Sequence, residues 1–264
     1  MICYSNLRVN MNWPYGLMGG VMKAVLITGA SRGLGLALVQ TFYKHKYQVY
    51  AVVRTANAYD MLTTMYPGVS VLVADVTHEN YESQLSGFIE HTKIDIVINN
   101  AGSAGTPGID TKRSTSDQLT YEFKTHCVGA LSTVKALLNH ENRMQPSLIV
   151  NISSRRGSLN MQAAGAAKGI KCSFSYRIAK AAQNMLSLCM ADDLESMGIK
   201  VISVHPGALL TKMAPADATL TPEQSASRLV DMIERDDVNS RDVWRWYSPD
   251  SCPQKGVVIR LQTG

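Results

Sequence analysis

The stretch Ala24-Val25-Leu26-Ile27-Thr28-Gly29-Ala30-Ser31-Arg32-Gly33-Leu34-Gly35 decides the fold that this sequence predicts. It begins with four apolar residues, a pattern typical of a strand that is buried on both faces. A glycine-rich turn follows, and the apolar spacing after it predicts a helix over Leu34–His45. Glycines at a strand-to-helix turn let the backbone approach a pyrophosphate, which then lies at the positive N-terminal end of the helix. A tight turn with no ligand is the alternative interpretation of the same residues.

The alternation of strand and helix continues along the chain. Short apolar runs predict buried strands, and longer stretches with helical periodicity predict helices. The strands are expected at Ala24–Ile27, Gln48–Val53, Val69–Val73, Ile94–Ile98, Leu148–Ile152 and Val201–Val204, and the further helices at Tyr81–His91, Ser116–Asn139 and Tyr176–Ser196. The predicted fold class is therefore α/β, a doubly wound parallel sheet of Rossmann type with helices on both faces. For Asp242–Tyr247 the sequence leaves open whether a last strand forms.

Two arginines indicate which dinucleotide the glycine-rich turn would bind. A site for NAD places an acidic residue about 20 positions further on, where it holds the ribose 2′-hydroxyl. Here the second strand ends Val52-Val53-Arg54-Thr55, with no carboxylate. Arg54 can hold a 2′-phosphate with a bidentate, charge-assisted pair, and Arg32 in the turn would supply a second positive charge. Together they predict NADPH, whereas either arginine alone would be interpreted as a solvated surface charge.

Tyr176 and Lys180 stand one turn apart on the same predicted helix face. A free tyrosine has a pKa near 10, and a neighbouring ammonium is the kind of charge that lowers it toward neutrality. The pair is therefore a candidate for proton transfer. Since the chain has 11 tyrosines, about half a match to this spacing is expected by chance, so the spacing alone proves little. A buried tyrosine packed against a lysine is the alternative.

Composition narrows the class of protein. The formal charge of +5 comes from scattered Lys and Arg residues, so nucleic-acid binding is not expected. Five cysteines, odd in number and without C-x-x-C pairing, argue against a disulfide framework and a zinc site, and they suit a reducing cytoplasm. The sequence contains no run of about 18 apolar residues, so it predicts no membrane span. It also contains no cluster of His, Asp or Glu that would suggest a metal.

Six motifs stand in order along the chain: Thr28-Gly29-x-x-x-Gly33-x-Gly35, Asp75-Val76, Asn99-Asn100-Ala101-Gly102, Ile152-Ser153-Ser154, Tyr176-x-x-x-Lys180 and Pro206-Gly207-x-x-x-Thr211. In this combination the chain resembles the short-chain dehydrogenase/reductase superfamily from about Met22 to Met213. Within it, Ser153-Ser154-Arg155-Arg156-Gly157-Ser158 and Ser175-Tyr176-Arg177 resemble the Sniffer-like carbonyl reductases and the C-factor signalling proteins.

The resemblance implies a role for each motif. Tyr176 would be the general acid that protonates a carbonyl oxygen, Lys180 would hold the nicotinamide ribose and lower the tyrosine pKa, and Ser154 would hydrogen-bond the substrate carbonyl. Asp75 would meet the adenine, and Thr211 the nicotinamide carboxamide or a phosphate. As alternatives, Asp75 caps a turn and Thr211 caps a helix. The residues implied to bind the cofactor are Gly29, Ser31, Arg32, Gly33, Leu34, Gly35, Arg54, Asp75, Val76, Asn100, Ala101, Gly102, Tyr176, Lys180, Pro206, Gly207 and Thr211.

The chain departs from the family pattern in two places. The catalytic serine usually precedes the tyrosine by about a dozen residues, whereas 22 positions separate Ser154 from Tyr176. The segment Arg155–Ser175 between them is rich in glycine and carries basic residues, and we expect a mobile lid beside the substrate. His126 stands where the family has an asparagine whose backbone carbonyl helps hold a proton-supplying water. A proton-relay role for His126 and a role of its backbone alone both remain open.

The function predicted from these residues is reduction of a carbonyl compound, an aldehyde, ketone or quinone, by hydride transfer from NADPH. A C-factor-like regulatory protein that binds NADP(H) with little turnover is the alternative. We expect residues 22–264 to form one NADP-binding domain that includes the substrate site, in a homodimer or homotetramer, and residues 1–21 to be a disordered leader.

Overall fold

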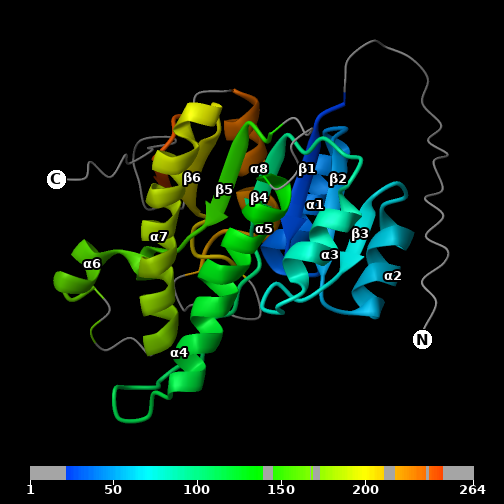
Figure 1. Ribbon diagram of the computed structural model, residues 1–264. Helices are drawn as coiled ribbons and strands as arrows, with labels where there is room; N and C mark the ends of the chain where they lie inside the picture. Colours follow the sequence, from blue (N-terminus) through cyan, green and yellow to red (C-terminus); the bar gives the residue numbers. More distant parts are fainter. Residues whose placement is uncertain are drawn as a thin grey trace.

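The computed structural model describes residues 22–138, 145–166, 168, 173–210, 218–235 and 238–245. Within them a central sheet lies between two layers of helices (Figure 1). The strands are β1 (Ala24–Thr28), β2 (Gln48–Val53), β3 (Ser70–Val73), β4 (Ile96–Asn99), β5 (Leu148–Ile152), β6 (Lys200–His205) and β7 (Val243–Arg245). The α-helices are α1 (Gly33–Lys44), α2 (Ala56–Met65), α3 (Tyr81–Phe88), α4 (Ser116–Phe123), α5 (Gly129–Leu138), α6 (Leu159–Ala163), α7 (Phe174–Leu194) and α8 (Pro222–Glu234).

The strand order is β3-β2-β1-β4-β5-β6-β7, and every pairing is parallel. This confirms the predicted fold class, a doubly wound sheet of Rossmann type. The order reverses between β1 and β4, so the loops that follow these two strands part and leave a crevice there. The last strand, which the sequence left open, forms at Val243–Arg245 beside β6, while residues 246 and 247 lie outside the described residues.

Two apolar layers cover the sheet because successive strand side chains point to opposite faces. In β1, Val25 and Ile27 belong to the core under α1, α2 and α8. Ala24 and Leu26 point the other way, into the core under α3, α5 and α7. All five residues of β1 are buried, which is what a strand with helices on both faces requires.

Helix boundaries differ from the prediction at one important place. The expected continuous helix Ser116–Asn139 is interrupted by a π-helical turn, η1 (Lys124–Val128), which separates α4 from α5. Asn139 lies outside the described residues. Such turns in an otherwise regular helix occur often at functional sites, and His126 stands in the middle of this one.

Three α-helices were missing from the sequence prediction, the short α6 and the longer α2 and α8, although their capping residues are visible in the sequence. Thr55 caps α2 by accepting from the Ala58 N–H group. At α8, Thr221 and Gln224 form a reciprocal capping box with Pro222 in the first turn. These are sequence-level start signals. In the part of the chain that the structure describes, no helix is long and apolar enough to cross a bilayer.

Candidate active site

The crevice at the switch point is built by hydrogen bonds between the ends of β1 and β4. The Thr28 hydroxyl accepts from the backbone N–H groups of Asn100 (3.1 Å) and Ala101 (3.0 Å). The Asn100 side-chain amide donates to the backbone carbonyls of Thr28 (2.9 Å) and Gly29 (3.1 Å). These bonds fix the loop after β4 against the glycine-rich turn, so both loops border the same space.

Two glycines in that turn are required by the geometry. Gly29 has a positive φ of 66°, and a Cβ there would lie 2.7 Å from the Ala101 Cα atom. A Cβ on Gly35 would lie 2.2 Å from the Gly29 carbonyl oxygen. Arg32, the residue that precedes α1, provides no side-chain cap, and the first turn of α1 contains no acidic residue. The N-terminal end of α1 therefore suits an anion.

A cavity of about 470 Å³ extends from this turn toward α7. Fifteen of the predicted cofactor-binding residues line it: Gly29, Ser31, Arg32, Gly33, Leu34, Gly35, Arg54, Asp75, Val76, Asn100, Ala101, Gly102, Tyr176, Lys180 and Pro206. Gly207 does not line the cavity, although its positive φ of 87° marks a turn at the end of β6. Thr211 lies outside the described residues. His126 also lines the cavity, as do several residues that the sequence analysis missed, among them Ser103, Tyr121 and Ser153.

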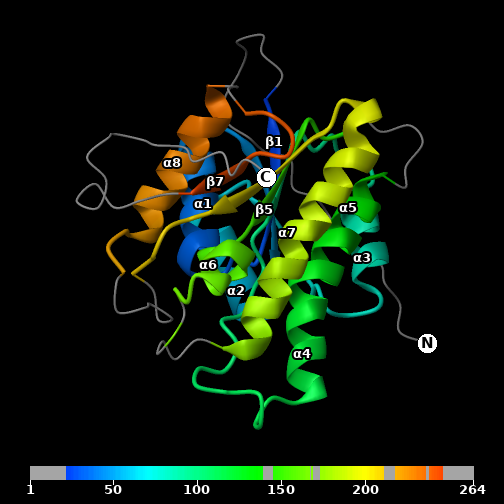
Figure 2. The same ribbon diagram turned by 90° about the vertical axis from the view of Figure 1, so that its left-hand side faces the viewer.

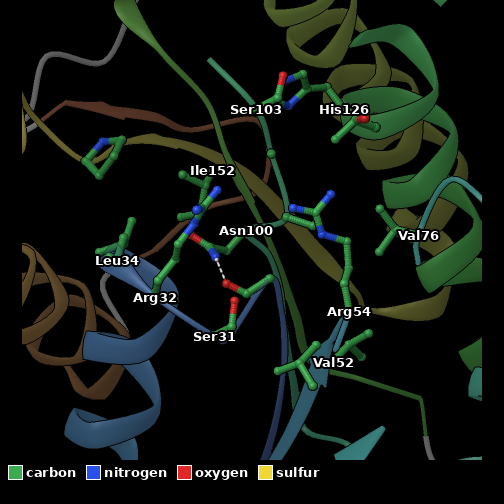
Figure 3. Close-up of a pocket in the computed structure, with 18 of the residues that line it drawn as sticks. Ser31, Arg32, Leu34, Val52, Arg54, Val76, Asn100, Ser103, His126 and Ile152 are labelled. Carbon is green, nitrogen blue, oxygen red and sulfur yellow. Dashed lines mark hydrogen bonds between the residues drawn. The ribbon is translucent and has the colours of Figure 1, made fainter. Parts of the chain in front are cut away.

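Two arginines lie at one end of the cavity. Figure 3 shows the Arg32 side chain reaching into the cavity from the start of α1, and the Arg54 side chain from the end of β2. Asp75 is the one carboxylate among the lining residues at this end, and it accepts from the Thr77 N–H group (2.9 Å) and hydroxyl (2.7 Å). Burial alone would raise the pKa of Asp75, but the Thr77 donors and the Arg54 charge lower it overall.

Tyr176 and Lys180 stand at the other end, on α7. The Ser173 hydroxyl accepts from the Tyr176 N–H group and so begins the helix two residues before the predicted start. Lys180 is only 4% exposed, and its Nζ atom donates to the Ile152 carbonyl (2.7 Å) and to Gln183 Oε1 (2.8 Å). The same Nζ atom lies 5.7 Å from the centre of the Tyr176 ring. Burial lowers the pKa of Lys180 to about 7, while Glu122 and the thiolate form of Cys127 would act in the opposite direction.

Ser154 is the second residue after β5 and does not line the cavity, whereas its neighbour Ser153 does. The Ser154 hydroxyl accepts from the Arg156 N–H group at 3.2 Å and caps a short 3₁₀ helix, η2 (Arg155–Gly157). Gly157 packs so closely on α7 that a Cβ there would lie 2.6 Å from the Lys180 carbonyl carbon. The start of the segment Arg155–Ser175 is thus packed closely against α7.

The other described residues of that segment include the short helix α6. Figure 1 shows α6 projecting beside α7, away from the sheet. One contact to α7 joins the Arg177 Nη1 atom to Gln162 Oε1 at 3.0 Å. None of the segment's described residues lines the cavity, while residues 167 and 169–172, including Lys171, lie outside the described residues. The lid therefore stays a prediction.

His126 is buried, with 1% of its surface exposed, and lies between α4 and α7. Its ring packs edge-on against the Tyr176 ring, with 5.4 Å between their centres. Its Nε2 atom lies 3.2 Å from Glu122 Oε2. On its other side, a Cβ on Gly102 would lie 2.8 Å from the His126 Cε1 atom, so the glycine makes room for the ring. Burial and the Lys180 charge hold the pKa of His126 well below its usual range.

The fold and the site together define a Rossmann-type α/β protein with its cavity at the topological switch point. The chain belongs to the short chain dehydrogenases, a family of oxidoreductases, since the model of that family matches residues 23–220. This confirms the family resemblance found in the motifs. In the described part of the chain, no group of three or more His, Cys, Asp or Glu side chains is placed to hold a metal ion.

Among curated proteins, human 17-beta-hydroxysteroid dehydrogenase type 2 is 31% identical over 199 residues. The match covers 73% of this chain and 49% of that enzyme, so the chain spans about half of its length. The C-signal protein of Myxococcus xanthus is 30% identical over 141 residues, which cover 53% of this chain and 81% of that protein.

Two solved structures share the fold. One is an NADPH-bound carbonyl reductase from chicken fatty liver, with a TM-score of 0.73, 23% identity and coverage of 90% of this chain and 98% of that one. The other is the carbonyl reductase Sniffer of D. melanogaster, with a TM-score of 0.71, 24% identity and coverage of 85% and 97%. Both are carbonyl reductases, and the sequence motifs resembled the Sniffer-like carbonyl reductases.

Proposed function

We propose that this chain reduces a carbonyl compound with NADPH, with Tyr176 as the general acid. One observation carries the proposal: a single cavity joins two arginines and a helix N-terminus at one end to Tyr176 and Lys180 at the other. A dinucleotide that holds its phosphates at the first end would bring its nicotinamide toward the second. The NADPH-bound chicken carbonyl reductase with the same fold supports this assignment.

The residues at the phosphate end fit NADPH better than NADH. Arg32 and Arg54 both line the cavity and are exposed there, so each can pair with a 2′-phosphate. The nearby Asp75 carboxylate is engaged by Thr77, and its position after β3 suits a contact with the adenine instead of the ribose. A ribose-binding acid at the end of β2, which would repel the phosphate, is replaced by Arg54.

The residues at the chemical end supply the proton. Bound NADPH provides the hydride, which adds to the carbonyl carbon. The Tyr176 hydroxyl donates its proton to the carbonyl oxygen, so that an alcohol forms and a tyrosinate remains. The Lys180 ammonium, one helical turn away, stabilises that tyrosinate and lowers its pKa. Since the pKa of Lys180 is about 7, its charge is fully present below neutral pH and declines above it.

Ser154 is proposed to orient the substrate carbonyl. Its bond to Arg156 uses the hydroxyl oxygen as an acceptor, and a serine hydroxyl also has a proton to donate. That proton can be directed at the carbonyl oxygen. Ser153 lines the cavity, but it donates its proton to Asn184 Oδ1 at 2.5 Å, which makes it the weaker candidate.

NADPH oxidation measured against a panel of aldehydes, ketones and quinones tests the proposal. The similarity to C-signal favours a second candidate, a regulatory protein that binds NADP(H) with little turnover. Tight NADPH binding without turnover of any panel member would favour that second function. Turnover that is lost in Tyr176→Phe would support the enzyme.

A further inference from the structure

Glu122 is a buried carboxylate that no motif of the sequence singled out. It stands in the last turn of α4 and is only 3% exposed. The Ser103 hydroxyl, from the loop after β4, donates to its Oε1 atom at 2.5 Å, and its Oε2 atom lies 3.2 Å from His126 Nε2. Both neighbours line the cavity, so the carboxylate lies directly behind the wall of the active site.

This carboxylate is ionised at neutral pH in spite of its burial. Burial by itself raises the pKa of Glu122, but the His126 and Ser103 contacts and the Lys180 charge lower it overall. The pKa of His126 is also lowered, so the imidazole is neutral at pH 7. A neutral imidazole adds no positive charge beside the carboxylate, so the negative charge of Glu122 stays in place. The cluster therefore carries one net negative charge.

That charge faces the catalytic helix. Helices α4 and α7 lie side by side, as both views show (Figures 1 and 2). Lys180 on α7 is buried, and burial of an ammonium favours its neutral form. The Coulombic influence between Lys180 and Glu122 acts in both directions: Glu122 raises the pKa of Lys180, and Lys180 lowers that of Glu122.

The groups that face Lys180 come from four elements. They are Tyr176 and Gln183 on α7, Cys127 and His126 on η1, the Ile152 carbonyl on β5, and Glu122 on α4. The Cys127 thiolate would raise the pKa of Lys180 more than Glu122 does, but burial raises the pKa of that thiol to about 11. The thiol is thus neutral at pH 7. Of these described groups, Glu122 alone brings a full negative charge at neutral pH.

We propose that Glu122 is a positioning residue of this site, whose buried carboxylate supplies the counter-charge to the Lys180 ammonium from behind His126. The proposal rests on the proposed function only in one respect, namely that Lys180 is a catalytic residue. His126 takes the place between the carboxylate and the Tyr176 ring, where it keeps water from the charge. A buried charge costs several kcal/mol unless it is compensated. Glu122 and Lys180 are both buried and opposite in sign, and each favours the charged form of the other.

The test titrates Lys180 directly. In protein labelled with ¹³C-lysine, the Lys180 Cε resonance is assigned by its loss in Lys180→Met and followed from pH 5 to pH 10. In Glu122→Gln, which keeps the side-chain shape and removes the charge, the midpoint should fall by about 1 pH unit, the size of effect that a nearby opposite charge exerts. Asp117→Asn is the matched control, because it removes an exposed carboxylate from the same helix, and its midpoint should equal that of the parent.

Enzyme activity gives a second readout that a merely structural role would not move. The alkaline limb of the pH–kcat profile should move to lower pH in Glu122→Gln and stay unchanged in Asp117→Asn. An unchanged Lys180 midpoint in folded Glu122→Gln would overturn the proposal, whether or not the protein turns over any substrate. An inactive parent protein with a lowered midpoint in Glu122→Gln would instead overturn the proposed function and leave the counter-charge established.

A measurement without a change at Glu122 covers the case in which Glu122→Gln does not fold. The ¹³Cδ resonance of Glu122 reports its own ionisation in the parent protein and in Lys180→Met. Without the ammonium, the carboxyl should titrate at a pH higher by about 1 unit. Titration at the same pH in both proteins would refute the pairing.

Discussion

The burial of Lys180 should make the stability of the protein depend on pH, and comparison with Lys180→Met measures that dependence. The unfolded chain holds this lysine at its ordinary pKa of 10.5, whereas the folded protein holds it at about 7. Between those two values the unfolded state binds one more proton than the folded state does. Stability therefore rises with pH in this window, and below pH 7 the full cost of burying the ammonium is present.

The slope of the unfolding free energy against pH sets the size of the expected difference between the two proteins. Each pKa unit corresponds to about 1.4 kcal/mol, so the parent should gain about 1.5 kcal/mol relative to Lys180→Met between pH 7 and pH 8.5. Methionine has a similar length and no charge, but it also loses the hydrogen bonds to Ile152 and Gln183. That loss does not depend on pH, so it shifts the difference between the two proteins without changing its slope.

Urea unfolding of the parent and of Lys180→Met at pH 6, 7, 8 and 8.5 gives the four differences in unfolding free energy that are needed. Groups whose pKa does not depend on Lys180 cancel in each difference. The difference should be nearly constant below pH 7 and should then move in favour of the parent. Differences that agree within about 0.3 kcal/mol across the whole range would show that Lys180 does not titrate near neutrality, since the slope above would be missing.

Four further predictions follow from the same site. In Tyr176→Phe, kcat should fall by about two orders of magnitude or more with NADPH affinity nearly unchanged, and turnover within a few-fold of the parent would contradict the mechanism. The parent should bind NADPH at least about tenfold more tightly than NADH, a difference of about 1.4 kcal/mol, and Arg54→Asp should shrink or reverse the ratio; equal affinities in the parent would refute this. Shortening Arg155–Ser175 to the family length should alter KM, and no change for any substrate would mark an inert insertion. His126→Asn should keep activity near that of the parent, with a relay role visible as a shifted pH–rate profile; a loss beyond about a hundredfold in folded protein would show that the imidazole is essential.

The sheet was the most predictable part of the molecule. Helices cover both faces of the sheet, so its strands must be apolar on both sides. Continuous runs of buried residues such as Ala24–Thr28 are therefore visible in the sequence. The switch point was equally accessible, because glycines with no tolerance for a Cβ stand at its turn. Helices α2 and α8 were missed because apolar periodicity was weighed above capping residues, although Thr55 and Thr221 mark their starts.

The π-helical turn was not accessible from the sequence. Apolar periodicity predicts a helix over Ser116–Asn139, but it does not show that one turn of this helix contains an additional residue. That residue rotates everything after it by about 100° relative to the helix before it. The position of His126 between Glu122 and Tyr176 depends on the local path of the chain through η1. From the sequence alone, Glu122 and His126 would be interpreted as an ordinary pair on a helix surface. The packing of α4 against α7 buries this pair.

The polar residues under the active site show why catalytic placement needs the whole fold. Lys180 bonds Gln183, the Gln183 carbonyl accepts from the Ser187 hydroxyl, and Ser187 accepts in turn from the Asn151 amide. Asn151 then accepts from the Asn99 amide across β4 and β5. Each of these groups is buried and would be costly without its partner, yet the partners stand up to 52 positions apart in the chain. No local pattern could predict the network. Its consequence is that the sheet itself, through β4 and β5, helps to hold Lys180 at the wall of the cavity.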